Sequence, residues 1–129
     1  MTLKDEKIDV NEDMGIAIRE ATKVGNLEMV CLLVKHGANP RVIEDSPLRI
    51  AAEYGHTILF QYFRDVGAKI DDFCLRVAIK NGFIDIVKAI LSSPSHSLVV
   101  TEEMIAKARE NGHRSMVKML DDAKGMGDA

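Results

Sequence analysis

Apolar side chains recur along the chain in four similar segments, each with a glycine near its middle. The glycines are Gly25, Gly55, Gly82 and Gly112, and they lie 30, 27 and 30 residues apart. Seven positions before each glycine stands a large aliphatic residue, at Ile18, Leu48, Leu75 and Ile105. Four positions before it stands an alanine, at Ala21, Ala51, Ala78 and Ala108. A third apolar column follows four positions after it, at Met29, Leu59, Ile86 and Met116. Such self-similarity at a fixed period indicates a repeat architecture.

The apolar spacing within each segment predicts two short amphipathic helices. Before the glycine, apolar residues fall at i and i+3, and after it they fall at i, i+1, i+3 and i+4. A glycine can adopt a positive φ and end the first helix, so each segment is expected to be a hairpin of two antiparallel helices. The residues expected to cap the first helices are Asp13, Ser46 followed by Pro47, Asp72 and Thr101.

A helical hairpin of this length cannot bury its apolar face alone, so neighbouring hairpins are expected to stack around a shared core. The sequence therefore predicts an all-α solenoid with Met29, Met116 and Met119 among its core residues. We expect one domain over residues 1–123, divided into repeats at residues 12–40, 41–70, 71–98 and 99–123. Residues 124–129 contain two glycines and match no column, which predicts a flexible C-terminal tail.

Composition supports a folded domain and excludes several classes of partner. Of the 129 residues 47% are hydrophobic and 29% charged, which is enough apolar material for a core. The net charge of -3 argues against binding to nucleic acid or to an anionic membrane surface. The two cysteines form no C-x-x-C motif, which favours a reducing compartment over a disulfide or zinc scaffold. No apolar run suits a signal peptide or a transmembrane helix, so we expect a cytoplasmic protein.

Two stretches resemble the ankyrin repeat. They are S-P-L-R-I-A-A-E-Y-G-H at Ser46–His56 and V-K-H-G-A-N at Val34–Asn39, and the resemblance covers about residues 12–123. The period is about 30 residues where the family has about 33, and the D-G-x-T turn is missing. The resemblance therefore implies an ankyrin-like α-solenoid with short or absent β-hairpin fingers. Tetratricopeptide and HEAT repeats fit less well because their periods are longer and they lack A-A-x-x-G-H. Shortened repeats look like those of viral and bacterial arrays, and an effector of that kind would act in the host cytosol.

Ankyrin domains bind other proteins through a concave groove formed by the first helices and the links between repeats. Carried over to this chain, the resemblance assigns partner contacts to the two residues before each mid-repeat glycine: Lys23, Val24, Glu53, Tyr54, Lys80, Asn81, Glu110 and Asn111. It assigns a second row to Arg19, Arg49 and Arg76. These arginines either hold a carboxylate or carbonyl of the partner or bond to links within the array. Tyr54 is either the principal contact or a residue packed on Arg49 or Lys80.

No set of residues suggests catalysis. His56 and His113 directly follow the mid-repeat glycine, where the family also has histidine, so we interpret both as structural. Cys31 and Cys74 have no histidine and acid at compatible positions, and the sequence contains no glycine-rich phosphate loop. We therefore expect neither an enzyme nor a bound cofactor or metal.

Three functional hypotheses follow from the sequence. The first is a non-catalytic protein–protein interaction module, a monomer that binds a protein partner through the groove. The alternative is a small inhibitor or effector that covers the active site of a host or cellular enzyme. The third is a self-associating array, which would need an apolar surface at an end of the chain. Candidates for that surface are Met14, Ala17, Met104 and Met119.

Overall fold

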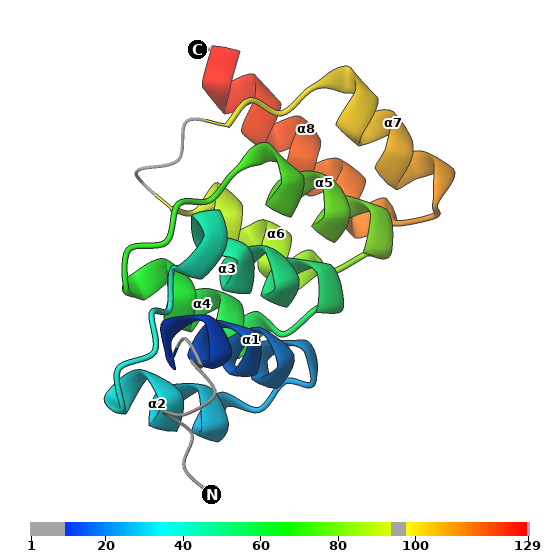
Figure 1. The fold of residues 1–129 in the computed structure, drawn as a ribbon. Coiled ribbons are helices and arrows are strands. Elements are labelled where there is room, and N and C mark those ends of the chain that lie inside the picture. The colour runs from blue at the N-terminus through cyan, green and yellow to red at the C-terminus, as the bar shows by residue number, and fades with distance from the viewer. Residues whose placement is uncertain (1–9, 94–97, 129) are drawn as a thin grey trace, which may run out of the picture. The chain divides into compact units, whose positions relative to one another are not determined.

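The computed structural model describes residues 10–93 and 98–128, which form eight α-helices (Figure 1). The chain divides into two compact units, Met1–Lys69 and Ile70–Ala129. The N-terminal unit contains the helices α1 (Val10–Lys23), α2 (Leu27–Lys35), α3 (Val42–Tyr54) and α4 (Thr57–Asp65). The C-terminal unit contains α5 (Asp72–Asn81), α6 (Ile84–Leu91), α7 (Glu102–Glu110) and α8 (Arg114–Asp128). No strand occurs among the described residues, and the predicted all-α class is confirmed.

The mid-repeat glycines end the first helices as predicted. Their φ angles lie between 76° and 79°, in the left-handed region that a residue with a Cβ adopts only at a cost. The chain reverses there, so α1 pairs with α2, α3 with α4, α5 with α6 and α7 with α8. Each unit thus holds two helical hairpins, and its first helices lie side by side, α1 against α3 and α5 against α7 (Figure 1).

The two columns before the glycine form the core. The large aliphatic residues of the first column are at most 1% exposed, and the alanines of the second column are at most 7% exposed. A small alanine one turn from a large aliphatic residue lets the neighbouring helices approach closely while the larger side chain fills the space between them. These columns therefore fix the position of each first helix within its unit.

The third column is buried in three repeats and not in the first. Leu59, Ile86 and Met116 are at most 2% exposed, whereas Met29 is 41% exposed. The predicted core position of Met29 is therefore wrong. α2 belongs to the first hairpin, and among the described residues it has a neighbouring hairpin on one side only. Met104, a candidate for an exposed apolar end, is buried at 3% exposure, which contradicts that expectation as well.

The structure corrects three of the four predicted helix caps. Thr101 caps α7 as predicted, because its hydroxyl accepts a hydrogen bond of 3.2 Å from the N–H of Met104. The cap of α5 is Asp71 and not Asp72, since the extended backbone of Asp71 aims its carboxylate at the N–H of Cys74.

The other two candidates do not cap a helix. Asp13 lies inside α1, which begins three residues earlier at Val10. The hydroxyl of Ser46 donates instead to the carbonyl of Val42, 3.0 Å away. Pro47 does lie in the first right-handed turn of α3, where its missing N–H has no consequence.

α3 opens with a left-handed turn that sequence reasoning did not predict. Ile43, Glu44 and Asp45 have φ angles of 49°, 51° and 63°, which is a costly conformation for residues with a Cβ. Asp45, only 8% exposed, holds the turn from within. Its carboxylate accepts two hydrogen bonds from Arg41, of 2.8 and 3.2 Å, and one of 3.1 Å from the N–H of Lys69. Asp45 thereby ties the link before α3 to the link after α4.

The last helix is longer than the sequence predicts. α8 continues to Asp128, over residues for which the glycines suggest a flexible tail. The boundary between the two compact units falls within one residue of the predicted boundary between the second and third repeats. A single domain over residues 1–123 stays a prediction, and its residues 1–9 and 94–97 lie outside the described residues.

Candidate functional site

The two residues before each mid-repeat glycine are exposed, at or just beyond the end of the first helix. We call them the pre-glycine pairs, and all eight side chains are exposed: Lys23, Val24, Glu53, Tyr54, Lys80, Asn81, Glu110 and Asn111. Val24 is 71% exposed and Tyr54 is 45% exposed, so each leaves apolar surface in contact with water. The pairs differ in charge and size from repeat to repeat, while the columns seven and four positions before the glycine are buried and apolar in all four repeats.

Tyr54 is held by its neighbours in the N-terminal unit. The ammonium of Lys23 lies 5.9 Å from the centroid of the Tyr54 ring, in a cation–π contact. The ring of His56 stacks on that of Tyr54 with a centroid distance of 6.4 Å and an interplanar angle of 7°. The tyrosine is thus partly ordered before any partner binds, which lowers the entropy that binding would cost.

His56 and His113 occupy equivalent structural positions in the two units. Nε2 of His56 lies 2.9 Å from the carbonyl oxygen of Lys23 in the preceding hairpin. The rings of His56 and His113 lie so close to Gly25 and Gly82 that a Cβ on either glycine would come within 2.7 Å of a ring carbon. Each histidine therefore fixes the spacing between two hairpins, which agrees with its structural interpretation.

The three arginines of the second row lie in different surroundings. Arg19 and Arg49, on α1 and α3, are half-buried, and Nε of Arg19 is buried with no hydrogen-bond acceptor among the described residues. Arg76, on α5, is exposed and bonds to the carboxylate of Asp72 and, at 3.1 Å, to that of Glu103. These hydrogen bonds raise the pKa of the Arg76 guanidinium above its usual value. Arg76 is therefore bonded within the chain, to side-chain carboxylates rather than to the links.

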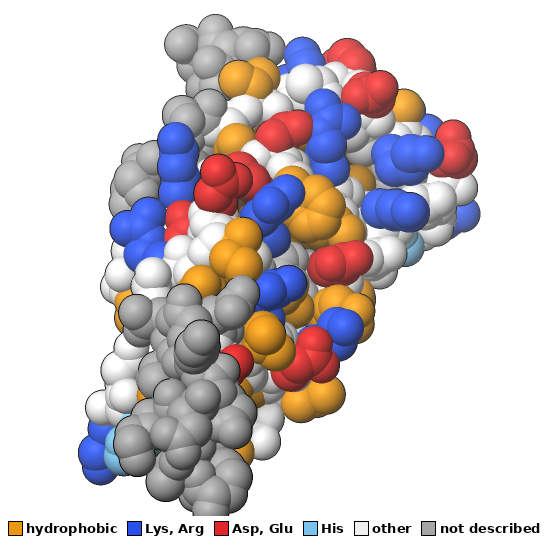
Figure 2. Space-filling view, viewed as in Figure 1, with side chains coloured by type: hydrophobic (Ala, Val, Ile, Leu, Met, Phe, Trp, Pro, Cys, Tyr) orange, Lys and Arg blue, Asp and Glu red, His pale blue; other side chains and the backbone are white. Residues whose placement is uncertain are grey.

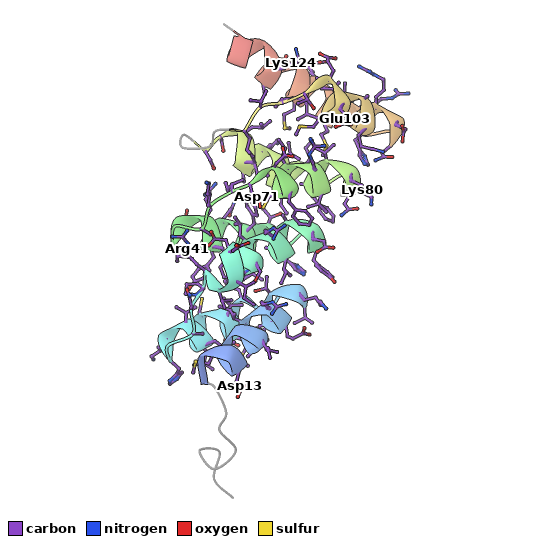
Figure 3. All side chains as sticks on the ribbon, turned by 45° about the horizontal axis from the view of Figure 1, so that its top comes forward. Asp13, Arg41, Asp71, Lys80, Glu103 and Lys124 are labelled. Atoms are coloured by element: carbon purple, nitrogen blue, oxygen red, sulfur yellow. The ribbon has the colours of Figure 1, made fainter. Side chains whose placement is uncertain are left out.

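A depression of about 230 Å³ lies between the first helices of the C-terminal unit. Its lining comes from α5 and α7 and consists of Arg76, Ile79, Lys80, Glu103, Met104 and Lys107. Figure 2 shows hydrophobic side chains with Lys and Arg side chains beside them over α5 and α7. Figure 3 labels Lys80 near the end of α5 and Glu103 in the first turn of α7.

Sequence reasoning identified only the α5 side of this depression. It assigned Arg76 and Lys80 to the groove, because they are equivalent to residues in the other repeats, but it did not assign Glu103, Met104 or Lys107 to it. These α7 residues occupy positions three to seven places before the pre-glycine pair of their own repeat. The missing signal is the packing of α5 against α7, which brings Arg76 beside Glu103, 27 residues later in the chain.

The cysteines and the other potential metal ligands form no metal-binding cluster among the described residues. Cys31 is exposed and Cys74 is buried, and both are free thiols. Within residues 13–93 and 98–124, no three His, Cys, Asp or Glu side chains are grouped so that they could hold a metal ion. None of the described helices is both long enough and apolar enough to pass through a membrane.

The chain matches a protein-family model over more than half of its length. The family model described as ankyrin repeats (3 copies) matches residues 15–103. The match includes three of the four predicted repeats and the beginning of the fourth, whose helices α7 and α8 form a hairpin like the others. No curated protein is significantly similar to the chain.

Proposed function

Because the chain belongs to the ankyrin repeat family, whose members are generally non-catalytic protein–protein interaction modules, we propose that it binds a protein partner through the concave groove formed by its first helices and their links. The contacts in this proposal are the pre-glycine pairs together with Arg19, Arg49 and Arg76. The module acts by binding alone, without a cofactor.

One observation carries the proposal. In every repeat the pre-glycine pair is exposed, although the alanine two positions before it and the aliphatic residue one turn earlier are almost completely buried. The scaffold therefore presents variable side chains from rigid helix ends, which is the arrangement that specific binding needs. Tyr54 is the strongest single contact in this proposal, since tyrosine is enriched among the residues that dominate binding energy.

Affinity capture with matched variants tests the proposal. Tyr54→Ala removes the exposed ring from the pre-glycine pair of the second repeat. As a control, Ile58→Ala removes an exposed apolar side chain from the second helix α4, where Ile58 is 62% exposed. A hot-spot tyrosine is worth about 2 kcal/mol or more, so Tyr54→Ala should weaken capture of the partner about thirtyfold. Ile58→Ala should leave capture unchanged.

Circular dichroism of both variants provides the folding control. Capture that is insensitive to Tyr54→Ala and to charge reversal of Lys23 would refute binding through the first-helix surface. An inhibitor would bind through the same surface, so the identity and the activity of the captured protein decide between the two hypotheses. If it is an enzyme whose turnover falls when the chain is added in equimolar amount, the chain is an inhibitor.

We also propose that the protein is monomeric and cytoplasmic. The surface best suited to self-association lies on α2, where Met29 and Leu32 are 41% and 47% exposed. Light scattering of the purified chain measures the oligomeric state directly, and a concentration-dependent dimer would replace this part of the proposal.

A further inference from the structure

The depression between α5 and α7 is built from two rungs of side chains above an apolar floor. In the first rung, Arg76 and Glu103 form an ion pair of 3.1 Å across the two helices. One helical turn further along each helix stand Lys80 and Lys107, which form the second rung. Ile79 and Met104, at 1% and 3% exposure, lie in the lining below the charged groups.

The charges of the two rungs are unequal. The charge of Arg76 is met by Asp72 and Glu103. Lys107 lies 3.5 Å from Glu110, an exposed partner on its own helix, and among the described residues Lys80 makes no ion pair. The lining as a whole contains three cationic side chains and one carboxylate. The second rung therefore places two ammonium groups at one depression and adds no carboxylate of its own, since the one carboxylate of the lining, Glu103, pairs with Arg76 in the first rung.

The size and lining of the depression restrict what can occupy it. Small-molecule sites usually measure about 300–1,000 Å³, so 230 Å³ suits a side chain of a larger partner better than a metabolite. The floor is aliphatic, and the flexible Met104 side chain can adapt to different shapes. The occupant that complements both features is an aliphatic side chain with an anionic group beside it.

The type of cation indicates the source of the anion. Lysine ammonium groups are point charges with freely rotating donors, whereas captured chain termini are usually held by backbone nests. The second rung is made of lysine side chains alone, which favours a side-chain carboxylate over a C-terminal one.

From this we propose that the α5–α7 depression binds a segment of the partner protein in which a large aliphatic side chain has an Asp or Glu within two positions of it. The aliphatic side chain lies on Ile79 and Met104, and the carboxylate lies between Lys80 and Lys107. This inference rests on the proposed function, since it specifies the chemistry of the partner at one part of the same surface. Because both lysines are exposed, the carboxylate chiefly sets specificity.

Selection from a displayed library of random dodecapeptides on the intact chain tests the proposal. The same selection is made on the charge-reversed variant Lys80→Glu/Lys107→Glu. The matched control, Lys88→Glu/Lys118→Glu, has the same net charge and reverses two exposed lysines on the second helices α6 and α8. We expect peptides with an acid beside an aliphatic residue to enrich on the unaltered chain and on the control. On the charge-reversed variant these peptides should bind about tenfold more weakly, and peptides with Lys or Arg in place of the acid should enrich instead.

Three outcomes overturn the proposal. These are equal binding of the selected peptides to the unaltered and charge-reversed chains, enrichment on the unaltered chain of peptides without an acidic residue, and no enrichment on the unaltered chain at all. A parallel selection on Tyr54→Ala separates this proposal from the general one. Ligands that lose binding to Tyr54→Ala but not to the charge-reversed variant would refute the acidic–aliphatic segment and leave the proposed function standing. Ligands insensitive to both changes would refute the proposed function.

Discussion

Replacing Gly82 or Gly112 by alanine should separate two costs that coincide at Gly82 and not at Gly112. Both residues lie in the C-terminal unit and have nearly the same φ, 76° and 79°. A Cβ on Gly82 would lie 2.6 Å from Cε1 and 2.9 Å from Nε2 of His113. A Cβ on Gly112 would meet no heavy atom within 4 Å. The two substitutions therefore share the backbone penalty and differ in the collision with the imidazole ring.

The magnitude follows from these two costs. A left-handed alanine costs about 1–2 kcal/mol, and the restriction of the unfolded chain returns about 0.4–1 kcal/mol. Gly112→Ala should therefore lower the free energy of unfolding by about 1 kcal/mol. Gly82→Ala also forces the His113 ring away from its preferred rotamer, which adds about 0.5–1.5 kcal/mol. We expect Gly82→Ala to be the more destabilising of the two by about 1 kcal/mol.

Urea unfolding followed by far-UV circular dichroism measures this difference. With a slope of about 1–3 kcal/mol per molar urea, a difference of about 1 kcal/mol moves the midpoint by about 0.3–1 M. A double-mutant cycle with His113→Ala identifies the cause, because removing the ring should make Gly82→Ala as costly as Gly112→Ala. Equal costs of the two glycine variants, or an extra cost that persists without the ring, would refute the reasoning.

Two further predictions concern the acidic residues Asp45 and Asp71, whose side chains accept hydrogen bonds from the backbone. Hydrogen bonding to the neighbouring arginine lowers the pKa of Asp45, so its stabilisation is complete above the unfolded pKa of about 3.9 and is lost as the pH falls through the lower folded value. The difference in unfolding free energy between the unaltered chain and Asp45→Asn should therefore be constant near neutral pH and shrink below about pH 4; an undiminished difference at pH 3 in urea titrations would contradict it. Asp71→Ala should lower the free energy of unfolding by about 1 kcal/mol more than Asp72→Ala, because Asp71 caps α5. Thermal unfolding of the two variants measures the difference, and a lower melting temperature for Asp72→Ala than for Asp71→Ala would contradict the assignment of the cap.

The hairpins could be predicted from the sequence because each repeat states the same pattern independently. The glycine, the alanine four positions before it and the aliphatic residue seven positions before it have one joint explanation, a first helix that ends in a left-handed turn. Four occurrences of the pattern make chance agreement implausible. The resulting predictions for Ala51, Leu75 and Gly82 agree with the structure in both burial and backbone conformation.

Features that depend on what surrounds a repeat could not be predicted in this way. Aligned columns assign Met29 the environment of Leu59, but burial depends on a neighbouring hairpin and not on the residue itself. The left-handed turn at residues 43–45 has no local signal, because Ile-Glu-Asp contains none of the residues that favour positive φ except the aspartate. The turn is stabilised by hydrogen bonds to Asp45 from two residues outside it. Arg41 lies in the link before α3, and Lys69 lies in the link after α4.

The same distinction explains why the candidate site was predicted only in part. The pre-glycine pairs occupy equivalent positions, so one repeat predicts the exposure of all the others. The α5–α7 depression joins non-equivalent positions, since Lys80 belongs to the pre-glycine pair and Lys107 lies one turn before the pair of its own repeat. In a repeat scaffold, equivalent residues of each repeat thus determine the fold, whereas the chemistry of a depression depends on which non-equivalent residues of two neighbouring repeats lie side by side. Because this side-by-side placement depends on how far each first helix is displaced along its neighbour, a one-residue change in the length of a link would alter which charges share a depression while leaving every buried column apolar.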